Sequence, residues 1–334
     1  MILNSLALQQ FRSYATESFS FSPDITLIVG PNAVGKTNII EAIYFLATGK
    51  SFRADTDREC ISFREKFARI KGITPDTTLE ILLTPLKKYL VNGVSKRMID
   101  FVGNFRAVLF WPEHLELVTD SPSLRRKYLD NVLVQVDREY RRNLLSYERG
   151  LRQRNRLLDL INEGKATRSQ LLFWNQLLIK AGGYLTDKRA EYIHFVNECQ
   201  MPNAEYQIEY DKSVISESRL EQYKDEEVAA KATLVGPHRD DMQFMMGDIS
   251  LSSYGSRGEQ RLAILWLKVA EVSFIQEKTV TRPMLLLDDI FSELDEGHKD
   301  LVFDLIGKQQ TIITSADPVG LSKLIKEKIN VIQL

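Results

Sequence analysis

Residues 25–45 place a strand pattern, a glycine-rich turn and a helix pattern in direct succession. Residues 25–29 are apolar and mostly β-branched, and the residues after the turn repeat with helical period. The turn fits G-x-x-x-x-G-K-[ST] at every required position. Its residues are Gly30, Pro31, Asn32, Ala33, Val34, Gly35, Lys36 and Thr37. The sequence therefore predicts a strand, a phosphate-binding loop and a helix in that order.

The chemistry of this turn points to a nucleoside triphosphate with magnesium. Two glycines let successive backbone N–H groups curl inward at the positive end of a helix. We expect Lys36 to be exposed in the empty loop and to reach the β- and γ-phosphates, while Thr37 ligates Mg²⁺. A glycine turn that binds nothing is the alternative, and the apolar stripe of the following helix disfavours it.

The composition is that of an ordinary globular protein. The 334 residues are 44% apolar and 27% charged, enough for one large domain or two modest ones. Cys60 and Cys199 lie far apart without metal-ligand spacing, so we expect no disulfide framework or zinc site and predict a reducing cytoplasm. We also expect no signal peptide and no membrane span, because the most apolar later segment, 262–275, is interrupted by charges.

The formal net charge of −1 gives no global sign of a nucleic-acid partner. Such a partner would therefore have to bind where positive charge is concentrated locally. Residues 121–156 carry ten Lys or Arg against four Asp or Glu. A solvated helix face is the alternative explanation, and Arg125 and Arg126 are also candidates for internal ion pairs. The candidate DNA contacts are Lys50, Arg53, Arg141, Arg142, Arg149 and Arg152.

Strand and helix patterns follow one another in blocks. Residues 1–30 and 67–110 predict strands, and the second block reads as an antiparallel sheet with a hairpin turn at Asn92 and Gly93. Residues 121–200 predict two or three long helices, broken near 162–164 and bent at Gly182 and Gly183. Residues 203–211 predict a strand, 216–231 an exposed acidic helix and 310–314 a last strand that closes the core.

An apolar run at 283–287 ends in two carboxylates, Asp288 and Asp289. Such a run is typical of a buried parallel strand whose C-terminal end faces a ligand crevice. Asp288 fits the Mg²⁺-holding acid that P-loop NTPases carry at the end of a neighbouring strand. Asp289 is placed to orient or deprotonate the attacking water. A solvated strand end is the alternative for this pair.

A second helix start provides another candidate phosphate-binding segment. We call it the signature segment, and it consists of Ser256, Arg257, Gly258 and Glu259. Its backbone amides could bind a phosphate. One chain cannot easily aim two helix N-termini at one γ-phosphate from opposite sides, whereas a second copy can. His238, in the nearby segment 236–241, is either a supporting histidine or a catalytic one.

Taken together, these segments resemble the RecF family of bacterial recombination and gap-repair ATPases, which are relatives of SMC and ABC-type ATPase heads. The segments that carry the resemblance are FRSY near residue 11, GPNAVGKT, GKSFR, LFWPEHLELV with SPSLRRKYLD, GPHRDD, SYGSRGEQR, LLLDDIFSELD and ITSAD. Together they are far more specific than any single motif.

The resemblance implies an α/β fold, namely an ABC-type P-loop ATPase head with a mixed sheet and an antiparallel β-subdomain. The head would comprise residues 1–120 and 231–334, and a helical lobe would be inserted at 121–230. The resemblance also implies an ATP-driven homodimer in which the signature segment of one subunit completes the phosphate site of the other. Arg12, in FRSY, would contact the nucleotide.

The implied function is ATP-dependent DNA binding in recombinational and gap repair. Such a protein would be a slow, Mg²⁺-dependent and DNA-stimulated ATPase that recognises double-stranded, gapped or junction DNA without sequence preference. It would assist RecA loading with RecR and RecO. The alternatives are a nuclease-coupled SMC-like head or a transporter ATPase subunit. The first would need a separate cluster of metal-binding acids and histidines, and the second would lack a basic helical insertion.

Two residues depart from the family pattern. Glutamine is more usual at the position of Glu259, and Trp111 replaces a small residue in the segment that corresponds to the Q-loop. An acid near a γ-phosphate would weaken ATP-dependent dimerisation unless its carboxylate points away. The helical lobe is also somewhat short for the family, which bears on its partner contacts.

Overall fold

The computed structural model describes residues 1–199, 201, 205–292, 302–303, 305–316 and 329–334. The chain divides into two compact units, the first formed by Met1–Leu115 and Ile264–Leu334 and the second by Glu116–Ala263. Residues 231–263, assigned to the head from the sequence, cluster with the second unit. They do so because β10 (Asp241–Met246) pairs antiparallel with β9 (Tyr206–Asp211).

The first unit contains a five-stranded parallel sheet that carries the phosphate loop. The strand order is β14-β3-β13-β12-β8. Every residue of its strands other than β14 is buried and most are apolar, as expected for a parallel sheet covered on both faces. The strands are β3 (Ile25–Val29), β8 (Ala107–Phe110), β12 (Met284–Asp288), β13 (Thr311–Ser315) and β14 (Ile329–Gln333).

A six-stranded antiparallel sheet forms the second layer of this unit, in the order β2-β1-β4-β5-β6-β7. The predicted hairpin at Asn92 and Gly93 is confirmed, since both residues have positive φ and Val91 pairs with Val94. The strands are β1 (Ser5–Phe11), β2 (Tyr14–Ser20), β4 (Ala68–Ile73), β5 (Thr78–Leu83), β6 (Lys88–Val91) and β7 (Val94–Lys96).

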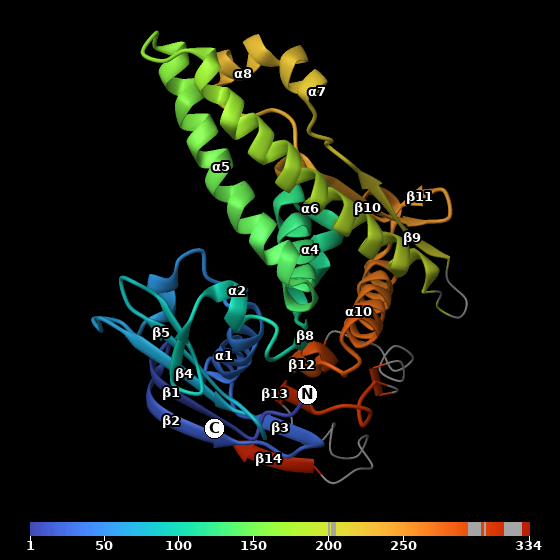
Figure 1. Ribbon diagram of the computed structural model, residues 1–334. Coiled ribbons are helices and arrows are strands. Elements are labelled where there is room, and N and C mark those ends of the chain that lie inside the picture. Colours follow the sequence, from blue (N-terminus) through green and yellow to red (C-terminus); the bar gives the residue numbers. More distant parts are fainter. Residues whose placement is uncertain (200, 202–204, 293–301, 304, 317–328) are drawn as a thin grey trace. The chain divides into compact units, whose positions relative to one another are not determined.

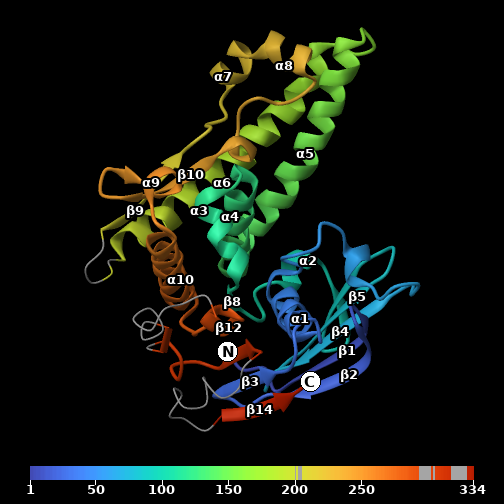
Figure 2. The ribbon, with the colours of Figure 1, turned by 180° about the vertical axis from the view of Figure 1, so that it is seen from behind.

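Helix α1 (Lys36–Thr48) lies between the two sheets and contacts strands of both (Figure 1, Figure 2). Only Thr37 and Asn38 in its first turn are not buried. A helix that packs on two sides needs apolar residues around its whole circumference rather than along a single stripe. This packing fixes the helix start at the C-terminal edge of the parallel sheet.

Three expectations about strands need correction. The strand at β8 was expected in the antiparallel sheet, but it pairs in parallel with β12. The strand expected to close the core, β13, lies inside the sheet between β3 and β12, and the edge strand is β14, which the sequence pattern did not reveal. Because β13 lies between β3 and β12, the strand that ends at Asp288 is not adjacent to the phosphate-loop strand, contrary to expectation.

The second unit is built on three long helices, α4 (Pro122–Val136), α5 (Arg138–Asn162) and α6 (Leu172–Glu198). The break predicted near 162–164 is confirmed, and the predicted bend at Gly182 and Gly183 falls inside α6, which is helical through both residues. A Cβ atom at Gly150 would lie 2.7 Å from Leu177 Cδ2. Helices α5 and α6 therefore pack closely along their length (Figure 1).

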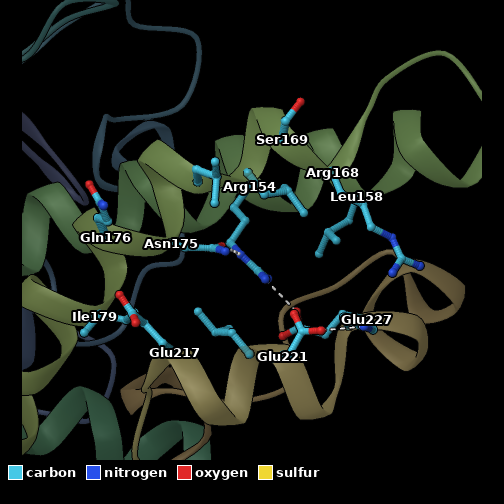
Figure 3. Close-up of a pocket in the computed structure, with 14 residues that line it drawn as sticks. Arg154, Leu158, Arg168, Ser169, Asn175, Gln176, Ile179, Glu217, Glu221 and Glu227 are labelled. Atoms are coloured by element: carbon cyan, nitrogen blue, oxygen red, sulfur yellow. Dashed lines mark hydrogen bonds and ion pairs between the residues drawn. The ribbon is translucent and has the colours of Figure 1, made fainter.

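A buried ion pair ties the predicted acidic segment to these helices. That segment forms two short helices, α7 (Glu217–Gln222) and α8 (Lys224–Ala230). Figure 3 shows Arg154 of α5 directed at Glu227 of α8, 2.6 Å apart, with both side chains at most 2% exposed. Arg154 also donates to Asn175 Oδ1 and Thr233 Oγ1. A buried pair with satisfied hydrogen bonds holds α8 in place, although such pairs add little net stability.

The remaining elements are short apart from α10, which contains the point in the sequence, between Ala263 and Ile264, where the second unit ends and the first resumes. In the described residues no helix is both long enough and apolar enough to cross a membrane. These elements are η1 (Asp57–Cys60), α2 (Met98–Phe101), η2 (Pro112–Leu115), α3 (Glu116–Thr119), η3 (Arg168–Leu171), η4 (Pro237–Arg239), β11 (Ile249–Ser250), α9 (Leu251–Tyr254), α10 (Arg257–Thr279) and η5 (Ile290–Ser292).

Candidate nucleotide-binding site

The phosphate loop connects β3 to α1 as the sequence predicts, and its conformation requires glycine at one position. Gly35 has φ +117°, and a Cβ atom there would lie 2.8 Å from the Tyr14 hydroxyl. Tyr14 donates a hydrogen bond to the Gly35 carbonyl oxygen at 3.2 Å, and burial raises the pKa of Tyr14 to about 12. The FRSY turn therefore supports the loop directly.

Lys36 is buried rather than exposed, with 7% of its surface accessible. Its Nζ donates to the carbonyl oxygens of Gly30 at 2.6 Å and Pro31 at 2.9 Å. A buried ammonium group needs such acceptors, and the loop supplies them. Binding a phosphate would exchange these carbonyl partners for phosphate oxygens, which carry a full negative charge.

Asp288 and Thr37 come together from elements 251 residues apart. The Thr37 hydroxyl donates to Asp288 Oδ1 at 3.2 Å, and Thr314 of β13 donates to the same oxygen at 2.6 Å. Asp288 is 3% exposed, and burial raises its pKa while the hydrogen bonds from the two threonines act in the opposite direction. Thr314 lies on β13, the strand between β3 and β12, and its hydroxyl connects that strand to Asp288.

The pair Thr37 and Asp288 fits a magnesium ion. Both offer oxygen atoms, and Mg²⁺ is held in nucleotide sites by few protein oxygens, with substrate phosphates and waters completing the octahedron. Within the residues that the structure describes, no group of three or more His, Cys, Asp or Glu side chains could hold a metal. When bound, such an ion would neutralise charge on the β- and γ-phosphates.

Asp289 follows Asp288 in a left-handed backbone conformation, with φ 51°. Its backbone N–H donates to Thr314 Oγ1 at 3.0 Å, so the hydroxyl of Thr314 contacts both acidic residues. This conformation turns the chain sharply after β12, and Asp289 is half-buried. The end of the LLLDDIFSELD segment, from residue 293, and the end of the ITSAD segment, at 317, lie outside the described residues.

The FRSY turn also places Arg12 and Ser13 beside the first turn of α1. Ser13 Oγ accepts a hydrogen bond from Asn38 Nδ2 at 2.9 Å. A cavity of about 540 Å³ opens here, which is large enough for part of a nucleotide. Its lining residues are Arg12, Ser13, Asn38, Arg58, Glu59, Ile61 and Phe63.

Arg53 of the GKSFR segment lies near the same helix. Its side chain is 38% exposed, and NH1 donates to Asn38 Oδ1 at 3.4 Å. Lys50 is exposed. Between them Phe52 packs edge-on against Tyr44 of α1 and against Trp111. Trp111 is thus part of an edge-on aromatic cluster with Phe52 of the GKSFR segment and Tyr44.

The signature segment lies in the second unit, at the start of α10. Glu259 Oε2 accepts hydrogen bonds from the backbone N of Ser256 at 2.7 Å and from its hydroxyl at 2.8 Å. This is a capping box, in which an acid three residues into the helix satisfies the cap residue. These hydrogen bonds lower the pKa of Glu259, so its carboxylate is charged and directed at its own helix start. Arg257 and Gly258 are exposed.

The arginines of α5 separate into two groups. Arg141 is only 7% exposed and donates to the Val134 carbonyl oxygen at 2.6 Å, so it is removed from the predicted set of DNA contacts. Arg142, Arg149 and Arg152 are exposed. Arg142 pairs with Glu139 one turn earlier, as surface arginines on long helices commonly do. Charge counting along the sequence could not distinguish these groups.

The GPHRDD segment is structural within the second unit. Arg125 makes a two-pronged ion pair with Asp241, as the internal ion-pair alternative predicts. Arg126 instead donates to a backbone acceptor, the Asp240 carbonyl oxygen. His238 Nε2 lies 3.0 Å from the Thr233 carbonyl oxygen and must donate to it, which leaves Nδ1 to accept from Tyr147. Burial lowers the pKa of His238 to about 4, so the ring is neutral, and both of its nitrogens have partners inside the second unit.

Sequence reasoning missed three groups that organise this site. Tyr14 braces the loop, Thr314 bridges the two acids, and Glu41 of α1 bonds to Arg12. Tyr14 and Thr314 lie inside the FRSY and ITSAD segments, so the resemblance pointed to their positions without giving their contacts. Glu41 had no signal of its own, because an acid within an apolar helix pattern reads as a solvent-facing residue.

Comparison with known proteins identifies the family of this chain. The family model for the RecF/RecN/SMC N terminal domain matches residues 2–333. The DNA replication and repair protein RecF of Lachnoclostridium phytofermentans is 37% identical, over 98% of this chain and 96% of the relative. The protein of the same name from Ligilactobacillus salivarius is also 37% identical, over 99% of this chain and 94% of the relative.

A solved structure of the recombination mediator protein RecF-ATPrS in the RecFOR pathway superposes with a TM-score of 0.89 at 29% identity. It covers 99% of this chain and 96% of that chain. The fold is an α/β ABC-type P-loop ATPase head, with a mixed sheet and an antiparallel β-subdomain, that carries a helical insertion. The chain belongs to the RecF family of DNA replication and repair proteins.

Proposed function

We propose that this protein is an Mg²⁺-dependent ATPase of recombinational gap repair that dimerises on binding ATP and binds DNA as a dimer. The observation that carries the proposal is the hydrogen bond between Thr37 at the start of α1 and Asp288 at the end of β12. Two oxygen ligands at the mouth of a phosphate loop are the protein's share of a Mg·ATP site. The RecF-ATP structure, with a TM-score of 0.88, supports ATP as the nucleotide.

Each residue of the site has a defined role in this proposal. The backbone N–H groups of the loop from Gly30 to Thr37, apart from Pro31, which has none, bind the β- and γ-phosphates together with the Lys36 ammonium, and Thr37 with Asp288 holds Mg²⁺. Asp289 accepts a proton from the attacking water or orients it. Arg12 contacts the nucleotide from the cavity beside α1. Electrostatic stabilisation of the phosphates supplies most of the catalysis.

Dimerisation on ATP rests on the signature segment. Ser256, Arg257 and Gly258 are exposed at a helix start, where a hydroxyl and backbone amides favour an anion. A second copy would bring this segment to the γ-phosphate bound by the first. Because the Glu259 carboxylate already occupies the Ser256 hydroxyl and amide, ATP-driven dimerisation would have to displace it.

DNA binding and partner proteins complete the proposal. The exposed arginines of α5, with Lys50 and Arg53, would contact phosphates of double-stranded, gapped or junction DNA without reading sequence. Dimerisation would double these contacts and so couple DNA affinity to ATP. A solved relative is a recombination mediator in the RecFOR pathway, which supports RecR and RecO as partners and RecA loading as the downstream step.

Lys36→Ala tests the phosphate site. The variant loses a charged hydrogen-bond donor worth about 1.5–3 kcal/mol, so ATP affinity should fall at least about tenfold. Titration with a fluorescent ATP analogue measures the change. Lys88→Ala, an exposed lysine on β6, is the matched control and should bind ATP like the parent. Unchanged affinity in Lys36→Ala would contradict the assignment of the phosphate loop.

Asp289→Asn tests the proposed base. The amide cannot accept the proton of water, so hydrolysis should slow about 10²- to 10⁴-fold while Mg·ATP still binds through Asp288. The variant should accumulate as an ATP-bound dimer, which light scattering detects. Asp288→Asn provides the contrast and should lose Mg²⁺-dependent ATP binding. Hydrolysis by Asp289→Asn at the parent rate would exclude Asp289 as the base.

Glu259→Gln tests the signature segment. Glutamine preserves the capping box but removes the negative charge that would face the γ-phosphate of the partner subunit. We expect the ATP-dependent dimer to form at lower protein concentration than in the parent, as measured by light scattering across a dilution series. Glu217→Gln, an exposed acid of α7 in the same unit, should leave the dimer unchanged. A weaker dimer in Glu259→Gln would refute this role of the carboxylate.

Replacement of three exposed arginines of α5 by glutamine tests the DNA surface. If all three bind phosphates, DNA affinity should fall, and the slope of log K against log salt should flatten by about 0.9 for each duplex phosphate that is no longer neutralised. The replaced residues are Arg142, Arg149 and Arg152. Affinity for gapped DNA is measured by fluorescence anisotropy between about 50 and 200 mM salt, a range over which the Debye length roughly halves.

A control with the same loss of charge separates local contact from general electrostatics. Lys165, Lys180 and Lys212 are exposed in the same unit and are replaced together by glutamine. We expect their removal to leave the salt slope close to that of the parent. An unaltered slope in the arginine variant would place the DNA contacts elsewhere, with Lys50 and Arg53 the next candidates.

A further inference from the structure

Glu41 is a fully buried carboxylate in the middle of the phosphate-loop helix. It lies on α1 with 0% of its surface exposed, among residues that are otherwise almost entirely apolar. Transferring a carboxylate into such a place is costly unless hydrogen bonds and an opposite charge satisfy it. Its presence therefore calls for an explanation in terms of its partners.

Arg12 is the main partner of Glu41. Arg12 NH2 donates to Glu41 Oε1 at 2.6 Å, and Arg12 Nε donates to Oε2 at 2.9 Å. This two-pronged pairing fixes the plane of the guanidinium as well as its position. Arg12 itself sits in a left-handed turn, with φ 53°, and its NH1 donates to the Glu59 carbonyl oxygen at 2.8 Å.

Glu41 also fixes the GKSFR segment. Ser51 Oγ donates to Glu41 Oε1 at 2.5 Å, and the same Ser51 oxygen accepts from the backbone N–H groups of Arg53 and Ala54. The guanidinium of Arg53 lies 4.0 Å from Glu41 Oε2. One carboxylate thus joins the FRSY turn and the GKSFR segment to the helix that begins at the phosphate loop.

The position of Arg12 gives this junction a functional meaning. Of the five N–H donors of Arg12, Glu41 and Glu59 take three, which leaves two for a ligand. Arg12 lines the cavity beside the first turn of α1, together with Ser13 and Asn38. A guanidinium already held in place loses little rotamer freedom when a ligand binds, and this preorganisation improves affinity.

We propose that Glu41 is a positioning residue for the nucleotide, and that it acts by holding Arg12 at the cavity beside the phosphate loop. This inference rests on the proposed function, since it requires that ATP occupies the loop and the adjoining cavity. Glu41 touches no ligand itself. Its effect on ATP binding passes through the guanidinium of Arg12.

A double-mutant cycle for ATP affinity tests the inference. Glu41→Gln breaks the two-pronged pairing, and Arg12→Gln removes the guanidinium that it holds. We expect each single variant to weaken ATP binding about tenfold, which corresponds to about 1.4 kcal/mol. The double variant should bind no more weakly than Arg12→Gln alone, because residues that act through one contact are not additive. A carboxylate that acts independently of Arg12 would not produce this saturation.

Two further variants guard against a general loss of stability. Glu80→Gln breaks the pair between Arg69 and Glu80, 2.8 Å apart on β4 and β5 of the same unit, and should leave ATP affinity unchanged. Glu41→Asp keeps the charge but shortens the side chain by one methylene, so that it misplaces Arg12. We expect Glu41→Asp to weaken ATP binding as well, and it serves as the test if Glu41→Gln does not fold.

The outcomes separate this inference from the proposed function. Parent-like ATP affinity in Glu41→Gln or Glu41→Asp would overturn the positioning role, as would losses in Glu41→Gln and Arg12→Gln that multiply in the double variant. Parent-like affinity in Arg12→Gln, with a loss in Lys36→Ala, would overturn the positioning role and leave the ATP site standing. Parent-like affinity in Lys36→Ala would instead remove the ATP site itself.

Discussion

The burial of α1 between two sheets is the constraint on which the first unit depends. The helix contacts strands of the parallel sheet on one side and of the antiparallel sheet on the other, so neither layer can shift without moving the phosphate loop. Tyr14 braces Gly35 from the antiparallel side, and Asp288 meets Thr37 from the parallel side. The candidate site therefore lies where both layers meet the helix start, and packing of the core sets its geometry.

The sequence predicted this arrangement well where a local pattern carries the information. The phosphate loop, the hairpin at Asn92 and Gly93 and the strand that ends at Asp288 follow from glycine positions and apolar runs. Strand order does not follow from such runs. The sequence placed Asp288 on a strand next to β3, but β13 lies between them, and Thr314 of β13 bridges the gap by hydrogen bonding to Asp288.

The burial of charged side chains was the hardest property to predict, because counting charges along the sequence does not distinguish buried ion pairs from solvated side chains. Arg141 and Arg154 belong to the basic stretch that suggested DNA binding, yet both are buried. Arg154 pairs with Glu227 and holds α8 to α5, which is a structural task. Lys36 and Glu41 give the same lesson in the first unit, since each is buried with its charge satisfied by partners that only the fold brings together.

The central claim is that each ATP site is built from residues of two subunits. Mixing two inactive variants tests this claim most directly. Lys36→Ala lacks a working phosphate loop, and Ser256→Arg carries a bulky cation where the γ-phosphate of a partner would lie. Each alone should fail to hydrolyse ATP, whereas an equimolar mixture should regain activity, because a mixed dimer joins one intact loop to one intact serine. A mixture as inactive as its components, or a Ser256→Arg protein that is active alone, would contradict a site built from two copies of this chain.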